Sequence, residues 1–94
     1  MTTRPFVYLD HAATTPCDPV VVEAMLPFFT ENFGNPSGVY AAARRVRQAI
    51  DAARDQAAAL LGAASPSEVI FTSGGTEADN LAVFGVALAA RERG

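Results

Sequence analysis

A Ser-Gly-Gly-Thr turn at residues 73–76 is the stretch of this chain best suited to bind a ligand. A short β-branched and aromatic run, residues 69–71, leads into it, and an apolar helical pattern starts at Leu81. This succession of strand, glycine turn and helix directs several backbone N–H groups and the positive end of the helix dipole at one point. The usual ligand there is an anion, most often a phosphate.

The side chains of this turn fit the same chemistry. Gly74 and Gly75 allow positive φ and a close approach of the backbone to a ligand. Thr76 adds a hydroxyl, and Asp79, three residues further on, suggests a variant of the capping box. The alternative is a capped turn that binds nothing, because a connection from a strand to a helix needs glycine in any case.

A second group of polar residues lies near the start of the chain, in the loop from Asp10 to Pro16. His11 is the only histidine, so it is the one candidate for a general base near neutral pH. A role as a hydrogen-bonding loop residue is the preferred interpretation. Cys17 is the only cysteine, which excludes an internal disulfide and favours a reducing compartment.

Composition limits the classes of function. The chain has 94 residues and a net charge of −3, which gives no basic surface for nucleic acid. Neither a signal peptide nor a membrane span is evident, so the expected location is cytoplasmic. All seven positively charged residues are arginine, and there is no lysine.

The pattern of the chain predicts an extended start, three helices and one strand. A first helix is expected from Pro19 to about Glu31, with Asp18 as its N-cap and a kink or an early end at Pro27. A long helix is expected from about residue 39 to residue 61, followed by Gly62 as its stop signal. The strand is expected over residues 68–72 and the last helix over residues 76–91.

The long helix carries an apolar stripe on one face. Its members recur at three- and four-residue steps: Val46, Ile50, Ala53, Ala57 and Leu60. The arginines of this helix, Arg54 among them, are interleaved with acidic residues, so a solvated face is expected rather than a phosphate site.

A single strand leaves its backbone groups without partners, and the last helix is apolar nearly all round, so it needs cover on more than one side. The sequence is therefore expected to be an incomplete part, residues 1–94, of a larger α/β domain, with no second domain.

Three motifs occur in order along the chain. They are Tyr8-Leu9-Asp10-His11-Ala12-Ala13-Thr14-Thr15-Pro16, Gly34-Asn35-Pro36-Ser37 and Phe71-Thr72-Ser73-Gly74-Gly75-Thr76-Glu77-Ala78-Asp79-Asn80. Together they resemble the N-terminal part of a cysteine desulfurase of the NifS/IscS type, in the class V aminotransferase family. The resemblance implies an N-terminal fragment of the pyridoxal 5′-phosphate (PLP) fold-type I aminotransferase fold.

The resemblance also implies roles for residues. Those that match Gly75 and Thr76 hold the phosphate of PLP in the family. The loop with His11, Ala12 and Ala13 corresponds to a segment near the carboxylate of the substrate. Cys17 does not match the sulfur-accepting cysteine of the family, which lies far downstream. The family binds PLP through a lysine, which this chain lacks, so no catalytic residue, no covalent PLP and no metal ligand is assigned to it.

The function implied is that of a fragment of a PLP-dependent cysteine desulfurase, which converts L-cysteine to L-alanine and transfers the sulfur to an enzyme cysteine as a persulfide. Such enzymes supply sulfur for iron–sulfur clusters and other pathways. A homodimer is expected, a sulfur-acceptor protein is a further partner, and the chain alone is expected to be inactive. Two alternatives stay open: a non-catalytic module that binds a phosphate or a partner, and another class V PLP enzyme.

Overall fold

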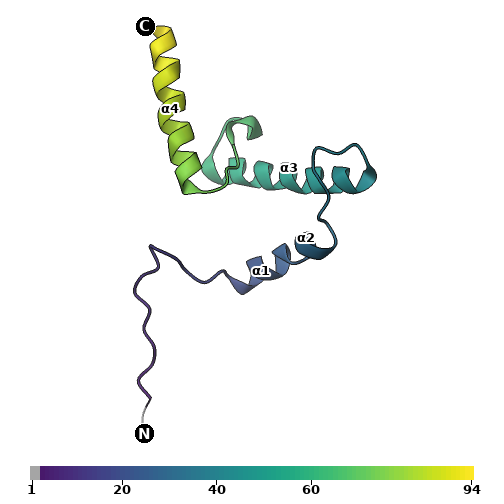
Figure 1. The fold of residues 1–94 in the computed structure, drawn as a ribbon, viewed down its shortest axis with the longest axis vertical. Helices are drawn as coiled ribbons and strands as arrows, with labels where there is room; N and C mark the ends of the chain where they lie inside the picture. Colours follow the sequence, from purple (N-terminus) through teal and green to yellow (C-terminus); the bar gives the residue numbers. More distant parts are fainter. Residues whose placement is uncertain (1–2) are drawn as a thin grey trace. The chain divides into compact units, whose positions relative to one another are not determined.

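A computed structural model describes residues 3–94 of the chain. Its elements are α1 (Pro19–Met25), α2 (Pro27–Thr30), α3 (Ala41–Leu61), the 3-10 helix η1 (Pro66–Glu68) and α4 (Gly75–Arg93). The chain divides into two compact units, residues 1–49 and residues 50–94, and α3 contributes to both. Figure 1 labels the four α-helices along the chain.

In the first unit, an extended segment leads through a turn into α1. The carboxylate of Asp18 accepts a hydrogen bond from the backbone N–H of Val20 over 2.9 Å, and Pro19 takes the first helical position. Helix α1 ends at Met25 and α2 begins at Pro27, because proline cannot supply the N–H that a continuous helix needs there. The predicted N-cap and the predicted interruption at Pro27 are both confirmed.

The loop before α3 is a tight turn packed on the first turn of that helix. Gly38 donates its N–H to the carbonyl of Asn35 over 2.9 Å, and the Asn35 side chain accepts from the N–H of Ser37 over 3.0 Å. The Tyr40 hydroxyl accepts a further bond from the N–H of Asn35 over 3.2 Å. The long helix starts at Ala41, two residues after its expected start.

In the second unit, α3 ends at a left-handed glycine. Gly62 has φ +70° and donates its N–H to Ala59, while Ala63 donates to Ala58 over 2.9 Å. This pair of bonds is a Schellman motif, which satisfies carbonyls that the helix end leaves free. The predicted stop at Gly62 is confirmed.

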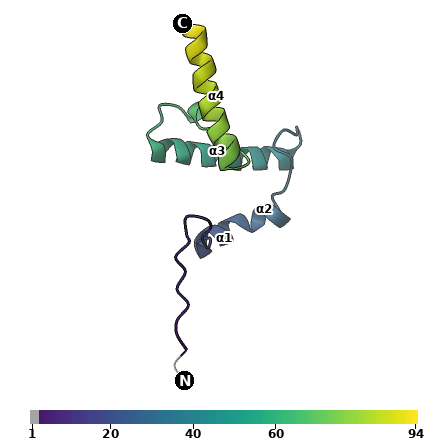
Figure 2. The same cartoon turned by 60° about the vertical axis from the view of Figure 1, so that its left-hand side comes forward.

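The strand expected over residues 68–72 is wrong as a strand. Glu68 closes η1 with a capping box to Ser65, and the described residues contain no β-bridge. Val69 is extended, with φ −95° and ψ 119°. Extended backbone is thus confirmed at Val69, but Glu68 is helical, and no strand within the described residues pairs with this segment. Figures 1 and 2 show this segment turning back beside the second half of α3.

Arg54 holds the extended segment and does not lie on a solvated face. Its side chain is only 27% exposed, and its Nε donates to the Val69 carbonyl over 3.2 Å. Its guanidinium lies 5.2 Å from the centroid of the Phe71 ring and pairs with Asp51. The placement of Arg54 among the solvated arginines is thus corrected.

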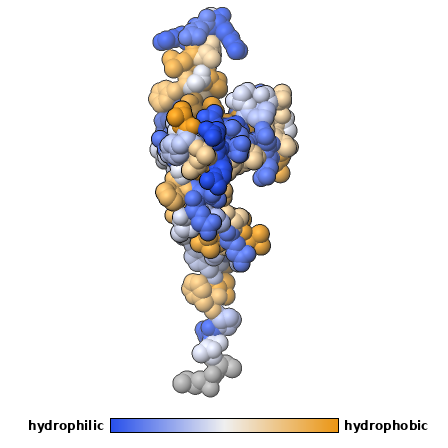
Figure 3. Space-filling view, turned by 90° about the vertical axis from the view of Figure 1, so that its right-hand side faces the viewer, coloured by the Kyte–Doolittle hydropathy of each residue, from blue (hydrophilic) through white to orange (hydrophobic). Residues whose placement is uncertain are grey.

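Little of the described chain is buried. The buried apolar side chains are Ala43, Val46 and Ala58, all on α3. Of the predicted stripe, Val46 is buried, but Leu60 is 87% exposed. Figure 3 shows apolar side chains, in orange, on the surface of both parts of the chain. Most large apolar side chains of the described residues are therefore exposed.

Candidate functional site

The N-terminus of α4 presents free hydrogen-bond donors. Gly74 is the N-cap, and the first backbone bond of the helix runs from the N–H of Ala78 to the Gly74 carbonyl over 3.1 Å. Within residues 3–94 no group accepts a hydrogen bond from the N–H groups of Gly75, Thr76 and Glu77. These three donors lie at the positive end of a 19-residue helix.

The helix start is fixed by Glu77, not by the expected pairing of Thr76 with Asp79. The Glu77 carboxylate accepts from the backbone N–H of Ser73 over 3.1 Å and from the Ser73 hydroxyl over 2.5 Å. These bonds, the hydroxyl first and the N–H second, lower the pKa of Glu77 below its ordinary value. The carboxylate thereby takes up the donors of Ser73, while the N–H groups of Gly75, Thr76 and Glu77 stay free.

The turn has room for a ligand at both glycines. Neither glycine lies in the left-handed region within this chain: Gly74 is extended, with φ 165° and ψ −177°, and Gly75 is the first helical residue. A Cβ atom at either position would meet no other atom within 4 Å. Nothing in the fold of this chain therefore requires glycine at these two positions, and the positive φ that glycine allows is not used at either.

Thr76 has an unused hydroxyl. No hydrogen bond is formed by its Oγ1 among the described residues, whereas its carbonyl accepts from the Asn80 side chain over 2.8 Å. The turn offers three N–H groups and one hydroxyl, which are the kind of donors that a phosphate group requires. The open space at Gly74 and Gly75 lets such a group approach them. These residues therefore fit the phosphate of PLP.

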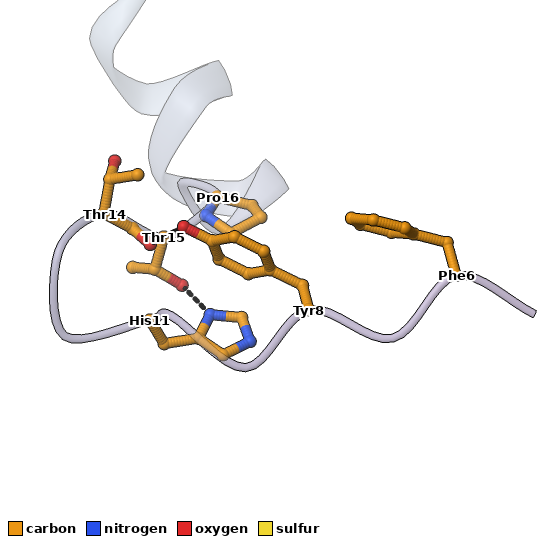
Figure 4. A pocket seen from close by; sticks show the side chains of 6 residues that line it. All are labelled: Phe6, Tyr8, His11, Thr14, Thr15 and Pro16. Carbon is orange, nitrogen blue, oxygen red and sulfur yellow. Dashed lines mark hydrogen bonds between the residues drawn. The ribbon is translucent and has the colours of Figure 1, made fainter.

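The loop around His11 forms a second polar group, which lies in the first unit. The Nδ1 atom of His11 is 2.7 Å from Thr15 Oγ1, and the His11 and Tyr8 rings meet edge to face with centroids 4.7 Å apart. Figure 4 shows these side chains. They line an open hollow with a volume of about 580 Å³. Its lining residues are Phe6, Tyr8, His11, Thr14, Thr15 and Pro16.

Ala12 and Ala13, expected on the substrate side, form the turn of this loop. The N–H of Ala13 donates to the Asp10 carbonyl over 3.1 Å, and neither alanine lines the hollow. The residues that sequence reasoning missed are Tyr8 and Thr15, which hold His11 in place. His11 and Thr15 are four residues apart in the sequence. In a helix this spacing would predict a contact between the two side chains, but in an irregular loop it predicts none.

A second hollow, of about 450 Å³, lies in the second unit beside α4. Its lining is mostly apolar: Glu68, Ile70, Thr72, Ala78, Leu81, Ala82, Gly85 and Val86. Among residues 3–94, no cluster of histidine, cysteine and acidic side chains could hold a metal ion. In the same part of the chain, no helix has the length and hydropathy needed to cross a membrane.

The chain belongs to the aminotransferase class-V family, whose sequence profile matches residues 7–94. Its relatives within this family are cysteine desulfurases, which confirms the resemblance to the N-terminal part of a NifS/IscS-type enzyme. The chain is 56% identical over 88 residues to the protein named "Putative cysteine desulfurase IscS 1" of Bacillus subtilis (strain 168). It is 54% identical to cysteine desulfurase IscS of Methanosarcina thermophila and 53% identical to a cysteine desulfurase of Frankia sp. (strain EuIK1).

Each of these three alignments covers 94% of the chain but only 20–23% of the relative. The chain thus spans less than a quarter of the length of the curated relatives it matches. No solved structure matches the chain.

Proposed function

We propose that this chain contributes the phosphate-binding turn and a substrate-side loop to a PLP-dependent cysteine desulfurase of fold type I. The observation that carries the proposal is the set of free donors at the start of α4: the N–H groups of Gly75, Thr76 and Glu77 and the Thr76 hydroxyl. The names of the relatives support the reaction.

Gly75 and Thr76 would hold the cofactor phosphate through backbone N–H groups and the threonine hydroxyl. PLP supplies an electron sink for breaking bonds in the bound amino acid. The loop of His11, Ala12 and Ala13 would lie on the substrate side and orient the carboxylate of L-cysteine. The reaction proposed for the whole protein moves the sulfur of L-cysteine to a protein thiol as a persulfide and leaves L-alanine.

The chain has no lysine, so its own residues cannot attach PLP covalently in the manner of the family. We therefore assign it non-covalent binding roles only, and the 94 residues alone should be inactive. Cys17, though exposed, is not assigned as the sulfur acceptor. The homodimer, a separate sulfur-acceptor protein, the supply of iron–sulfur cluster assembly and the cytoplasmic location belong to the same proposal for the complete protein.

The test of the phosphate site joins this chain to the remaining segment of a relative and measures the dissociation of PLP. A hydrogen bond to a charged phosphate contributes about 1.5–3 kcal/mol. Thr76→Val, which keeps the shape and removes the hydroxyl, should therefore weaken PLP retention by about ten- to a hundred-fold. Thr76→Ser keeps the donor and should be nearly neutral. Equal retention by the Thr76→Val protein and the parent would remove the role of the hydroxyl.

Gly75→Ala separates ligand binding from folding. A Cβ at Gly75 meets nothing within the chain, and alanine favours helix by about 1 kcal/mol over glycine. The substitution should therefore leave helix content unchanged or raised, while the methyl group obstructs an approaching phosphate and weakens PLP retention. If the Gly75→Ala protein lost both helix content and PLP binding, the glycine would instead have a structural role as a helix cap.

The inactivity of the 94 residues alone has its own test. With L-cysteine and added PLP, the chain should release no more alanine or sulfide than free PLP does. Release above that background would contradict the assignment of non-covalent roles only.

A further inference from the structure

We infer that Tyr8 and Thr15 are positioning residues, which hold the imidazole of His11 so that its Nε2 atom is the one presented to a ligand. Thr15 fixes one edge of the ring through the contact of 2.7 Å between Oγ1 and Nδ1. Tyr8 fixes its tilt, since the two ring planes meet at 83°. The inference rests on the proposed function only for the nature of the ligand, an amino-acid carboxylate.

Tyr8 is itself tied to the loop that it supports. Its hydroxyl lies 2.9 Å from the Thr14 carbonyl and 3.1 Å from the Asp10 carbonyl, and it donates its proton to these two acceptors. The phenol thus spans the loop from its first residue to the residue before Thr15. Figure 4 shows the His11 ring below the Tyr8 ring, with one ring nitrogen facing the hydroxyl of Thr15.

These contacts decide which ring nitrogen can act on a ligand. Nδ1 is taken up by Thr15, and no group among the described residues bonds to Nε2. A neutral imidazole has one donor and one acceptor nitrogen, and a carboxylate ligand needs a donor. The ring proton is therefore assigned to Nε2, which makes Nδ1 the acceptor for the hydroxyl proton of Thr15.

The experiment is nuclear magnetic resonance of the full 94-residue chain, in which His11 is the only histidine and its ring signals are unambiguous. In the neutral form of the ring, the nitrogen shifts should report a protonated Nε2 and an unprotonated Nδ1. Cross-relaxation between the imidazole and phenol protons should report one ring orientation. All the contacts lie within residues 8–15, so they do not depend on the burial of a core.

Thr15→Val should move both ring-nitrogen shifts to those of a histidine in an unstructured peptide, and Thr15→Ser should restore the parent shifts. Thr14→Val is the matched control: Thr14 takes part in the hydrogen bonds of this loop only through its backbone N–H and carbonyl, so the ring-nitrogen shifts of this variant should stay those of the parent. Tyr8→Leu should abolish the ring-current shift of the His11 protons.

The inference would be overturned if the parent and Thr15→Val chains had the same ring-nitrogen shifts. It would also be overturned if Thr14→Val changed these shifts as much as Thr15→Val does. The measurement needs neither cofactor nor amino acid. A failure here therefore leaves the phosphate-site proposal standing, and a silent Thr76→Val in the PLP assay leaves this one standing.

Discussion

The Nε atom of Arg54 on α3 donates a hydrogen bond of 3.2 Å to the carbonyl oxygen of Val69, fifteen residues further along the chain. This bond joins the helix to the extended segment that leads into the glycine turn. Because the guanidinium also lies over Phe71, one side chain sets the path of the backbone toward Gly74. The segment that precedes α4 is thus held by a residue of α3 that none of the three motifs contains.

Arg54→Met should loosen this segment. Methionine keeps an unbranched apolar stem but loses the hydrogen bond and the cation–π contact, which together contribute about 1–2 kcal/mol for a partly exposed side chain. The surface pair with Asp51 contributes little. Limited proteolysis within residues 62–74 should become about five- to thirty-fold faster. Arg45→Met, on an exposed position of the same helix, is the control, and cleavage at the parent rate in both variants would refute the role of Arg54.

Glu77 should make the start of α4 sensitive to acid. Its pKa is lowered by the bonds from Ser73, so its carboxylate stabilises the folded turn above the ordinary glutamate pKa. That contribution is lost as the pH falls through the lower folded-state pKa. Helix content followed by circular dichroism should therefore fall with acidification over that interval. The Glu77→Gln chain should lack this step, and an identical acid profile for both chains would contradict the assignment.

Gly38 and Gly85 should respond in opposite directions to alanine. A Cβ at Gly38 would lie 2.5 Å from Tyr40 Cε1 and 2.9 Å from the Cβ of Ala43, whereas one at Gly85 meets nothing within 4 Å. Gly38→Ala should destabilise by about 1–3 kcal/mol through overpacking. Gly85→Ala should stabilise by about 0.5–1 kcal/mol through helix propensity. Urea midpoints of the chain joined to the rest of a relative measure both, and a stabilising Gly38→Ala would show that the turn is loosely packed.

The isolated chain should self-associate. Val83, Phe84 and Val86 on α4 are 62–72% exposed, and exposed apolar patches of this size promote association. Sedimentation velocity should show species larger than a monomer that grow with concentration. Val83→Ser with Val86→Ser should reduce them, while Glu92→Gln on the same helix should not. A monomer with one sharp melting transition would show instead that the chain is self-sufficient.

Features set by neighbours in sequence could be predicted. The cap by Asp18, the break at Pro27 and the stop at Gly62 each depend on residues within one helical turn, and all three are observed. The predicted cap of α4 was wrong: it paired Thr76 with Asp79, whereas the N-cap is Gly74 and the carboxylate is that of Glu77. Both Glu77 and Asp79 are spaced to reach back, and the competition between them is decided by the backbone path of Ser73.

Features that need a distant partner could not be predicted. Val69 is extended as expected, but an extended segment becomes a strand only where another strand pairs with it. Arg54 was predicted to lie on the solvated face because a search for apolar residues at helical spacing treats arginine as polar. Its long side chain instead reaches the ring of Phe71. In the loop of His11, the residue types indicated polarity, but the partners Tyr8 and Thr15 depend on how the loop turns.

The left-handed backbone of Gly62 also favours a D-amino acid over an L-amino acid at this position. A Cβ there meets no neighbour, so an L-alanine would suffer only from the φ of +70°, a cost of about 1–2 kcal/mol. A D-alanine, whose preferred backbone angles have the opposite sign, would keep the positive φ with which α3 ends at this residue. It would also reduce the freedom that glycine gives the unfolded chain. At this residue, replacing glycine with D-alanine would stabilise the chain, whereas replacing it with L-alanine would destabilise it.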